Sequence, residues 1–189
     1  MPLTPAGLTA TLTAGLASAG NIGAKVPQLA AGVAAGVMTW NATFKVITVD
    51  AGTAGVGTGI LPCAIPQPLL LANLLAGLAA TGNVGVRLPL LALGLANGLA
   101  TGFLQGLITT QHPSVGVGTA VAKFVGASAV AGMISGFASV GMVGPGPTKI
   151  ATGIGIGIDT AFAAFTIPVP IVGSASPSGA SGSGFGVIL

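Results

Sequence analysis

The sequence predicts an α-rich α+β fold built from three tandem repeats of one Gly/Ala-rich unit. Three observations predict it: a segment that recurs at a fixed offset, a glycine-centred turn between two apolar segments, and a short β-branched run after the second segment. We expect a single domain over residues 1–189. Its repeats span about 3–64, 65–122 and 123–172, and a Gly/Ser-rich C-terminal tail follows at 173–189.

The internal repeat is the strongest signal in the chain. The segment 14–27 matches 76–89 at a constant shift of 62 residues, as from Gly20 to Gly82. A third copy follows after a further shift of 59 residues, with Met142 in place of the asparagine of the first two copies. Matches at one offset over a long segment indicate repetition of one supersecondary unit.

Each copy is predicted to form an αα-hairpin, in which a tight glycine-containing turn joins two helices. The first helices are expected at about 5–19, 68–81 and 124–140. Glycine just past a helical segment is typical of a helix end, because glycine adopts the left-handed conformation without strain. Pro27 and Pro89 suit the first turn of the second helix. The predicted turn residues are Gly20, Asn21 and Gly23 in the first copy, Gly82, Asn83 and Gly85 in the second, and Gly141 and Gly144 in the third.

The second helix of each copy is predicted to pack closely on another helix. It carries two glycines four residues apart, which lie on one helix face and form a groove for a neighbouring backbone. Each interior glycine costs about 1 kcal/mol of helix propensity relative to alanine, so we expect packing against other protein to offset this cost. The predicted helix-packing interface consists of Gly32, Gly36, Gly94, Gly98, Gly153 and Gly157.

A short strand and a Gly-rich loop are expected after each hairpin. β-branched residues dominate these runs, as they do in strands, and glycine dominates the segments that follow. The strands are expected at 45–49, 107–110 and 166–172, and the loops at 52–59, 115–119 and 173–184.

The composition excludes a nucleic-acid-binding protein. Charged residues make up 4% of the chain, against about 25% in a typical soluble domain. The pI near 9.6 reflects five scattered cations, whereas a nucleic-acid interface needs a basic stripe. The mean hydropathy of +0.98 instead indicates a membrane protein or a subunit buried in an assembly.

No catalytic, cofactor-binding or metal-binding residue is predicted, and we expect the protein not to be an enzyme. The segment 45–59 resembles a strand followed by a nucleotide-binding loop, but prolines follow it where a helix should begin. Asp50 and Asp159 are isolated, whereas acid–base catalysis needs neighbouring titratable groups. One cysteine, Cys63, and one histidine, His112, provide neither a disulfide nor a metal site, and His112 is expected in a turn.

Two sets of residues receive structural interpretations. Lys25 and Arg87, at equivalent turns, are expected to solvate the hairpin tips or to cap the carbonyls of the preceding helix. Aromatic residues near the ends of the second helices are expected to share a core position: Trp40, Phe103, Phe162 and Phe165.

Two interpretations of the hydrophobicity remain. In the first, the small residues and three similar units belong to a subunit of a large assembly, buried by neighbours and placed at a symmetry axis or between rings. In the second, the hairpins insert into a bilayer, because 88–110 carries no charge over 23 residues. The short first hairpin and the missing aromatic belt favour the assembly.

The turns and the runs 45–59 and 167–172 resemble small structural proteins of tailed bacteriophages. The resemblance implies a non-enzymatic virion component in the head, neck or tail-baseplate region. Its partners would be other virion proteins and copies of itself, and no nucleic acid. The resemblance implies no cofactor and no catalytic residue. The alternative function, based on the hydrophobicity, is a membrane-inserted helical-hairpin protein, either a pore former or a virion protein that contacts the host membrane; we favour it less.

Overall fold

The computed structural model describes most of the chain. The backbone is described over residues 3–41, 45–52, 55–60, 67–104, 107–114, 117–163, 166–169, 171–176 and 179–187. Side chains are described over 3–40, 67–103 and 124–163.

Three αα-hairpins form a helical body. The first helix begins after Thr4, whose hydroxyl oxygen accepts a hydrogen bond from the Gly7 N–H at 3.1 Å, as expected of an N-cap. The helices of the three hairpins are α1 (Pro5–Ser18) and α2 (Lys25–Asn41), α3 (Gln67–Ala80) and α4 (Leu88–Leu104), and α5 (Gly126–Ser139) and α6 (Pro145–Ala163).

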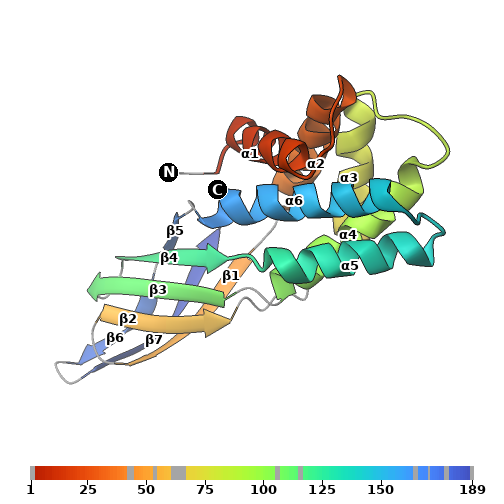
Figure 1. Cartoon of the computed structure of the whole chain (residues 1–189). Coiled ribbons are helices and arrows are strands. Elements are labelled where there is room, and N and C mark those ends of the chain that lie inside the picture. The colour runs from red at the N-terminus through yellow and green to blue at the C-terminus, as the bar shows by residue number, and fades with distance from the viewer. Residues whose placement is uncertain are drawn as a thin grey trace.

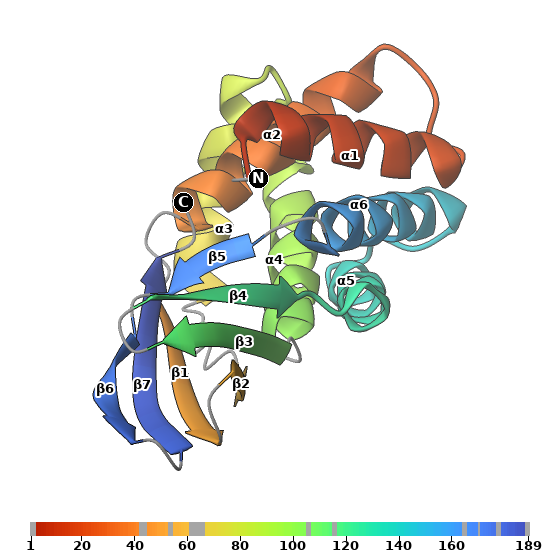
Figure 2. The ribbon, with the colours of Figure 1, turned by 90° about the vertical axis from the view of Figure 1, so that its left-hand side faces the viewer.

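The three hairpins close into a ring. Each helix contacts its own hairpin partner, and α2 also packs on α3, α4 on α5 and α6 on α1. The last contact returns the end of the third hairpin to the start of the first, which Figures 1 and 2 show as α6 running beside α1. Because the three hairpins are repeats of one sequence unit, the ring has approximate three-fold symmetry.

Equivalent residues of the repeats fill one shared core. Val33, Leu95 and Ile154 hold the same position in the second helix of each hairpin, and all three are fully buried. The first helices contribute a second equivalent set, in which Leu16 and Leu78 are replaced by the larger Phe137 in the third copy. The repeated hydrophobic positions therefore belong to one core and not to three separate ones.

An aromatic cluster lies at the C-terminal ends of the second helices. The ring centroid of Phe103 lies 4.8 Å from those of Trp40 and Phe124 and 5.2 Å from that of Phe162. Trp40, Phe103 and Phe162 are buried, as is Phe124. The expected shared core position is therefore confirmed for Trp40, Phe103 and Phe162, whereas Phe165 lies outside the described residues.

The strands project from one end of the helical body, away from the hairpin turns (Figures 1 and 2). One sheet has the order β1-β7-β6 and the other β2-β3-β4-β5, and every described pairing is antiparallel. The strands are β1 (Lys45–Gly52), β2 (Gly55–Ile60), β3 (Leu107–Ser114), β4 (Val117–Lys123), β5 (Thr166–Val169), β6 (Ile171–Ser176) and β7 (Gly179–Val187).

The expected fold class, an α-rich α+β fold in which one short strand and a Gly-rich loop complete each hairpin, is wrong. The part of the chain whose side chains are described is an all-helical body of six helices, and it contains no strand. Its described core residues lie on helices or directly beside them. Three mutually packed hairpins already bury the apolar faces of one another, so this core needs no sheet to cover it.

Several local expectations outside the helical body also fail. The segments expected as Gly-rich loops overlap β2, β4 and β7, and most of 173–189, expected as a tail, lies in β6 and β7. His112 lies within β3 opposite Gly55, and not in a turn. Asp50 lies within β1 opposite Gly182. Glycine is a poor strand former in isolation, but pairing between distant segments can override that local preference.

Candidate functional site

The glycines of the predicted helix-packing interface lie between hairpins of the same chain. A β-carbon on Gly36 would lie 2.7 Å from the Leu74 Cα, and one on Gly157 would lie 2.6 Å from the Leu12 Cα. These obstacles are backbone atoms, which cannot move aside as a flexible side chain can. The pairs face the next repeat around the ring: Gly32 and Gly36 face α3, Gly94 and Gly98 face α5, and Gly153 and Gly157 face α1.

The first helices supply a matching glycine that the sequence interpretation did not assign to the interface. Gly15 lies against Gly153 and Gly157, Gly77 lies against Gly32 and Gly36, and Gly136 lies 3.0 Å, measured from an added β-carbon, from the Gly94 Cα. These three glycines recur at the repeat offset, which is the signal that could have identified them. The chain thus fills its own glycine grooves, and no second subunit is needed for this packing.

The three hairpin turns share one backbone geometry. In the first turn the Asn21 N–H donates to the Leu16 carbonyl at 2.9 Å, and the Gly20 N–H donates to the Ala17 carbonyl at 2.9 Å. This pair of bonds is the Schellman motif, which requires a left-handed residue at the helix end. Gly20, Gly82 and Gly141 meet that requirement with φ of 78°, 80° and 75°.

The turn asparagines connect neighbouring repeats. The Asn21 amide donates to the Lys149 carbonyl of α6 at 2.9 Å, and the Asn83 amide donates to the Gln28 carbonyl of α2 at 3.1 Å. Gln28 and Lys149 hold equivalent repeat positions, so the two hydrogen bonds are the same contact made around the ring. Met142 replaces the asparagine in the third copy and has no amide to donate, which explains why this contact is absent at the third junction.

Large aliphatic side chains project from all three turns into solvent. Ile22 is 90% exposed, Val84 82%, Val86 94% and Val143 74%. The other exposed large apolar residues among the described side chains are 39%, 38% and 45% exposed: Leu69, Ile134 and Ile156. The strongest apolar exposure of the helical body therefore lies at its turns.

An open hollow lies among the turns. It comprises two adjoining cavities of about 460 and 350 Å³. Both are lined by Lys25, Asn83, Leu91 and Ile150. Leu91 and Ile150 are repeat equivalents of Leu29, which lines the smaller cavity, and all three are half-buried. The lining is thus drawn from all three repeats and is largely aliphatic.

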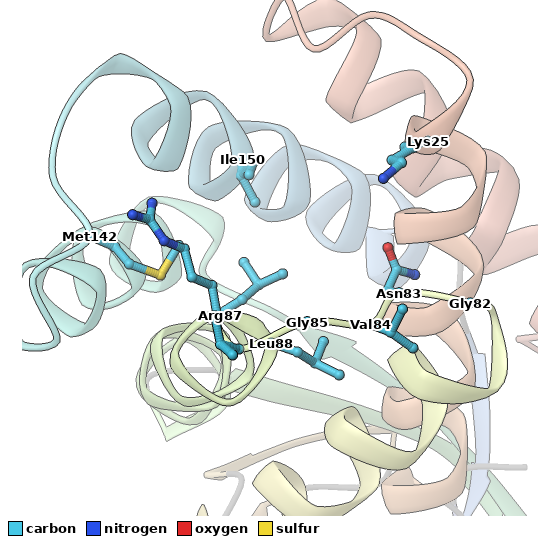
Figure 3. A pocket seen from close by; sticks show the side chains of 11 residues that line it. Lys25, Gly82, Asn83, Val84, Gly85, Arg87, Leu88, Met142 and Ile150 are labelled. Atoms are coloured by element: carbon cyan, nitrogen blue, oxygen red, sulfur yellow. The ribbon is translucent and has the colours of Figure 1, made fainter.

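Cations stand around this hollow. Lys25 is the first residue of α2, and Arg87 directly precedes α4. Figure 3 shows the Lys25 and Arg87 side chains on different sides of the larger cavity, with Met142 beside Arg87 and Ile150 on α6. Lys149, near the start of α6, lies over the first turn, because a β-carbon on Gly20 would stand 3.6 Å from its Nζ. The expectation that Lys25 and Arg87 merely solvate the tips or cap carbonyls did not anticipate this shared hollow.

We define the tip face as the three turns with their exposed aliphatic residues, the hollow and its cations. The first turns of α2, α4 and α6 contain no acidic residue. Asp159, the acid whose side chain is described, lies late in α6 beside Gly126 at the start of α5. The tip face is therefore both apolar and positively charged.

The remaining candidates form no reactive group in the described residues. Cys63 lies outside the described residues, and the side chains of His112 and Asp50 are not described. Among the residues searched, no three His, Cys, Asp or Glu side chains come close enough to hold a metal ion. Within the same part of the chain, no helix is both long and apolar enough to cross a membrane.

Comparison of the chain with protein-family models, with curated proteins and with solved structures finds no match.

Proposed function

We propose that the protein is a non-enzymatic structural component of a tailed-phage virion, located in the head, neck or tail-baseplate region. It is held there by close apolar packing against other virion proteins and copies of itself. The observation that carries the proposal is a closed, three-fold pseudosymmetric ring with an uncharged outer wall. Virion parts are organised about symmetry axes, and a chain that contains three similar units fits such a position.

We define the outer wall of the ring as the exposed side of the first helix of each hairpin, opposite its four buried residues. Its exposed residues are mostly small, and none is charged, so a neighbouring helix or sheet can approach closely without burying an unpaired charge. A free monomer with so little surface charge has low colloidal stability. The exposed wall residues are Pro5, Ala6, Gly7, Ala10, Ala14, Ala17 and Ser18 on α1, Pro68, Leu69, Ala72, Ala76, Ala79 and Ala80 on α3, and Ala127, Ala131, Ile134, Ser135, Ala138 and Ser139 on α5.

The proposed presence of the chain in the virion is tested with intact particles. Antibodies raised against the purified chain are used to probe density-gradient fractions from cells that carry the gene, after a detergent wash that removes membrane fragments. Co-migration of the chain with DNA-filled particles supports the proposal. Absence of the chain from those fractions contradicts it.

The role of the outer wall in assembly is tested with Ala76→Glu, which places a charge on the exposed face of α3. We expect the variant to fold but to be incorporated poorly, because assembly would bury an unpaired carboxylate. Thr160→Glu, at an exposed position near the end of α6, is the matched control. Equal incorporation of Ala76→Glu and the unmodified chain contradicts the role of the wall.

A further inference from the structure

We propose that the tip face docks reversibly on the surface of an anionic phospholipid bilayer. The aliphatic turn residues enter the headgroup region, and the hollow lies over the lipid phosphates between the cations. This inference goes beyond the virion role and does not depend on it, because it concerns a different face of the molecule from the uncharged wall.

The exposure pattern is the first argument. Ile22, Val84, Val86 and Val143 are each at least 74% exposed, and each belongs to a turn whose backbone is held by two Schellman hydrogen bonds. Exposed aliphatic residues that serve no packing in the free chain usually mark a contact surface. Because the turns that carry them are ordered, these side chains can enter the headgroup region of a bilayer with little further loss of backbone conformational freedom.

Charge is the second argument, and it selects the partner. Lys25, Arg87 and Lys149 all lie near the beginning of a helix, where the helix macrodipole disfavours a cation. Lys149 also lies beside the C-terminal end of α1, where a cation is favoured, but together the three residues concentrate positive potential at the tip face. Anionic lipid surfaces attract basic residues of this kind.

The shape of the face is the third argument. Leu29, Leu91 and Ile150 give the hollow an aliphatic lining, and Lys25 and Arg87 give it a cationic rim (Figure 3). This order of apolar and cationic groups complements a phospholipid, which combines a phosphate with acyl chains. The same order disfavours a second copy of this face, whose cations would repel those of the first.

The experiment uses the purified full chain and extruded vesicles in a co-sedimentation assay. One set of vesicles contains phosphatidylcholine alone, and the other contains phosphatidylcholine with one-third phosphatidylglycerol. We expect binding to the anionic vesicles at low ionic strength, at least about tenfold weaker binding to the neutral ones, and loss of binding as salt screens the charges.

Two variants test the tip face directly. Val84→Ser/Val86→Ser removes two exposed aliphatic groups, and Lys25→Gln/Arg87→Gln removes two cations. Each is expected to weaken binding to anionic vesicles about tenfold or more, since each basic residue near a lipid surface contributes several-fold. All four positions are exposed, and circular dichroism verifies that the variants remain helical.

Two control variants distinguish binding through the tip face from non-specific hydrophobic adsorption and from an effect of net charge. Ile156→Ser removes an exposed aliphatic residue in the later half of α6, and Asp159→Asn raises the net charge away from the tips. Both are expected to bind as the unmodified chain does. The proposal is overturned if anionic vesicles are not bound, if neutral vesicles are bound equally well, or if the tip variants bind as tightly as the controls. Any of these outcomes leaves the particle experiment unaffected.

Discussion

Gly77 of α3 lies so close to Gly36 of α2 that a β-carbon on Gly77 would stand 2.7 Å from the Gly36 backbone nitrogen. The equivalent distance from Gly15 of α1 to the Gly157 nitrogen of α6 is also 2.7 Å. Two junctions of the ring thus share one backbone-to-backbone geometry. At the third junction, between α4 and α5, the larger Phe137 and the unbranched Met133 take the places of leucines beside the glycines.

Gly36→Ala is expected to destabilise the ring by about 1–3 kcal/mol, because the new methyl group overpacks a contact between two backbones. This cost exceeds the gain of about 1 kcal/mol in helix propensity. Gly146→Ala, where no atom lies within 4 Å of the added carbon, is the matched control and should be neutral or stabilising. Urea unfolding followed by circular dichroism measures both. Equal stability of the two variants would contradict the close packing.

Gly82→Ala is expected to lower the free energy of unfolding by about 1–2 kcal/mol for a different reason. An added β-carbon meets no neighbour there, but φ is +80°, a conformation that costs other L-residues this amount. Gly82→Asn should cost less, because asparagine visits this region more readily. Equal unfolding midpoints for the alanine and asparagine variants would argue against backbone strain as the cause.

Asn83→Asp is expected to destabilise the chain by about 1 kcal/mol, the typical contribution of one hydrogen bond. The aspartate keeps the shape of the side chain, but an ionised carboxylate cannot donate to the Gln28 carbonyl. Asn83→Ala should lose the same bond, together with the one that the amide donates to the Thr81 hydroxyl oxygen at 3.0 Å. Thermal unfolding at neutral pH measures both variants, and an unchanged midpoint for both would show that this contact between repeats adds no stability.

Phe103→Ala is expected to cost about 3–5 kcal/mol, because the ring is buried among Trp40, Phe124 and Phe162. Since Trp40 is the single tryptophan, its fluorescence reports on this cluster. Emission should shift to longer wavelength in Phe103→Ala and stay near that of the unmodified chain in Phe103→Leu. Identical emission from both variants would place Trp40 outside the cluster.

Local signals in the sequence were sufficient to locate the hairpins and their turns. A helix end capped by glycine depends on residues within one or two turns of the chain, so Gly20, Gly82 and Gly141 could be placed at the ends of the first helices from their neighbours alone. The repeat offset then carried the same geometry to all three copies. The role of Asn21 and Asn83 could not be read in this way, because their acceptors lie 128 and 55 residues away.

Three similar units, each with a glycine face on its second helix, could be recognised from the order of residues alone. What covers that face follows from the way the hairpins pack, because a glycine groove specifies close approach but not the identity of the approaching helix. The return of α6 to α1 closes the ring, so the chain buries its own grooves, brings Lys25, Arg87 and apolar residues of all three repeats to one hollow, and leaves the turn aliphatics exposed. The Gly-rich segments were predicted as loops for the same reason, since strand pairing there depends on partners far along the chain and not on local composition.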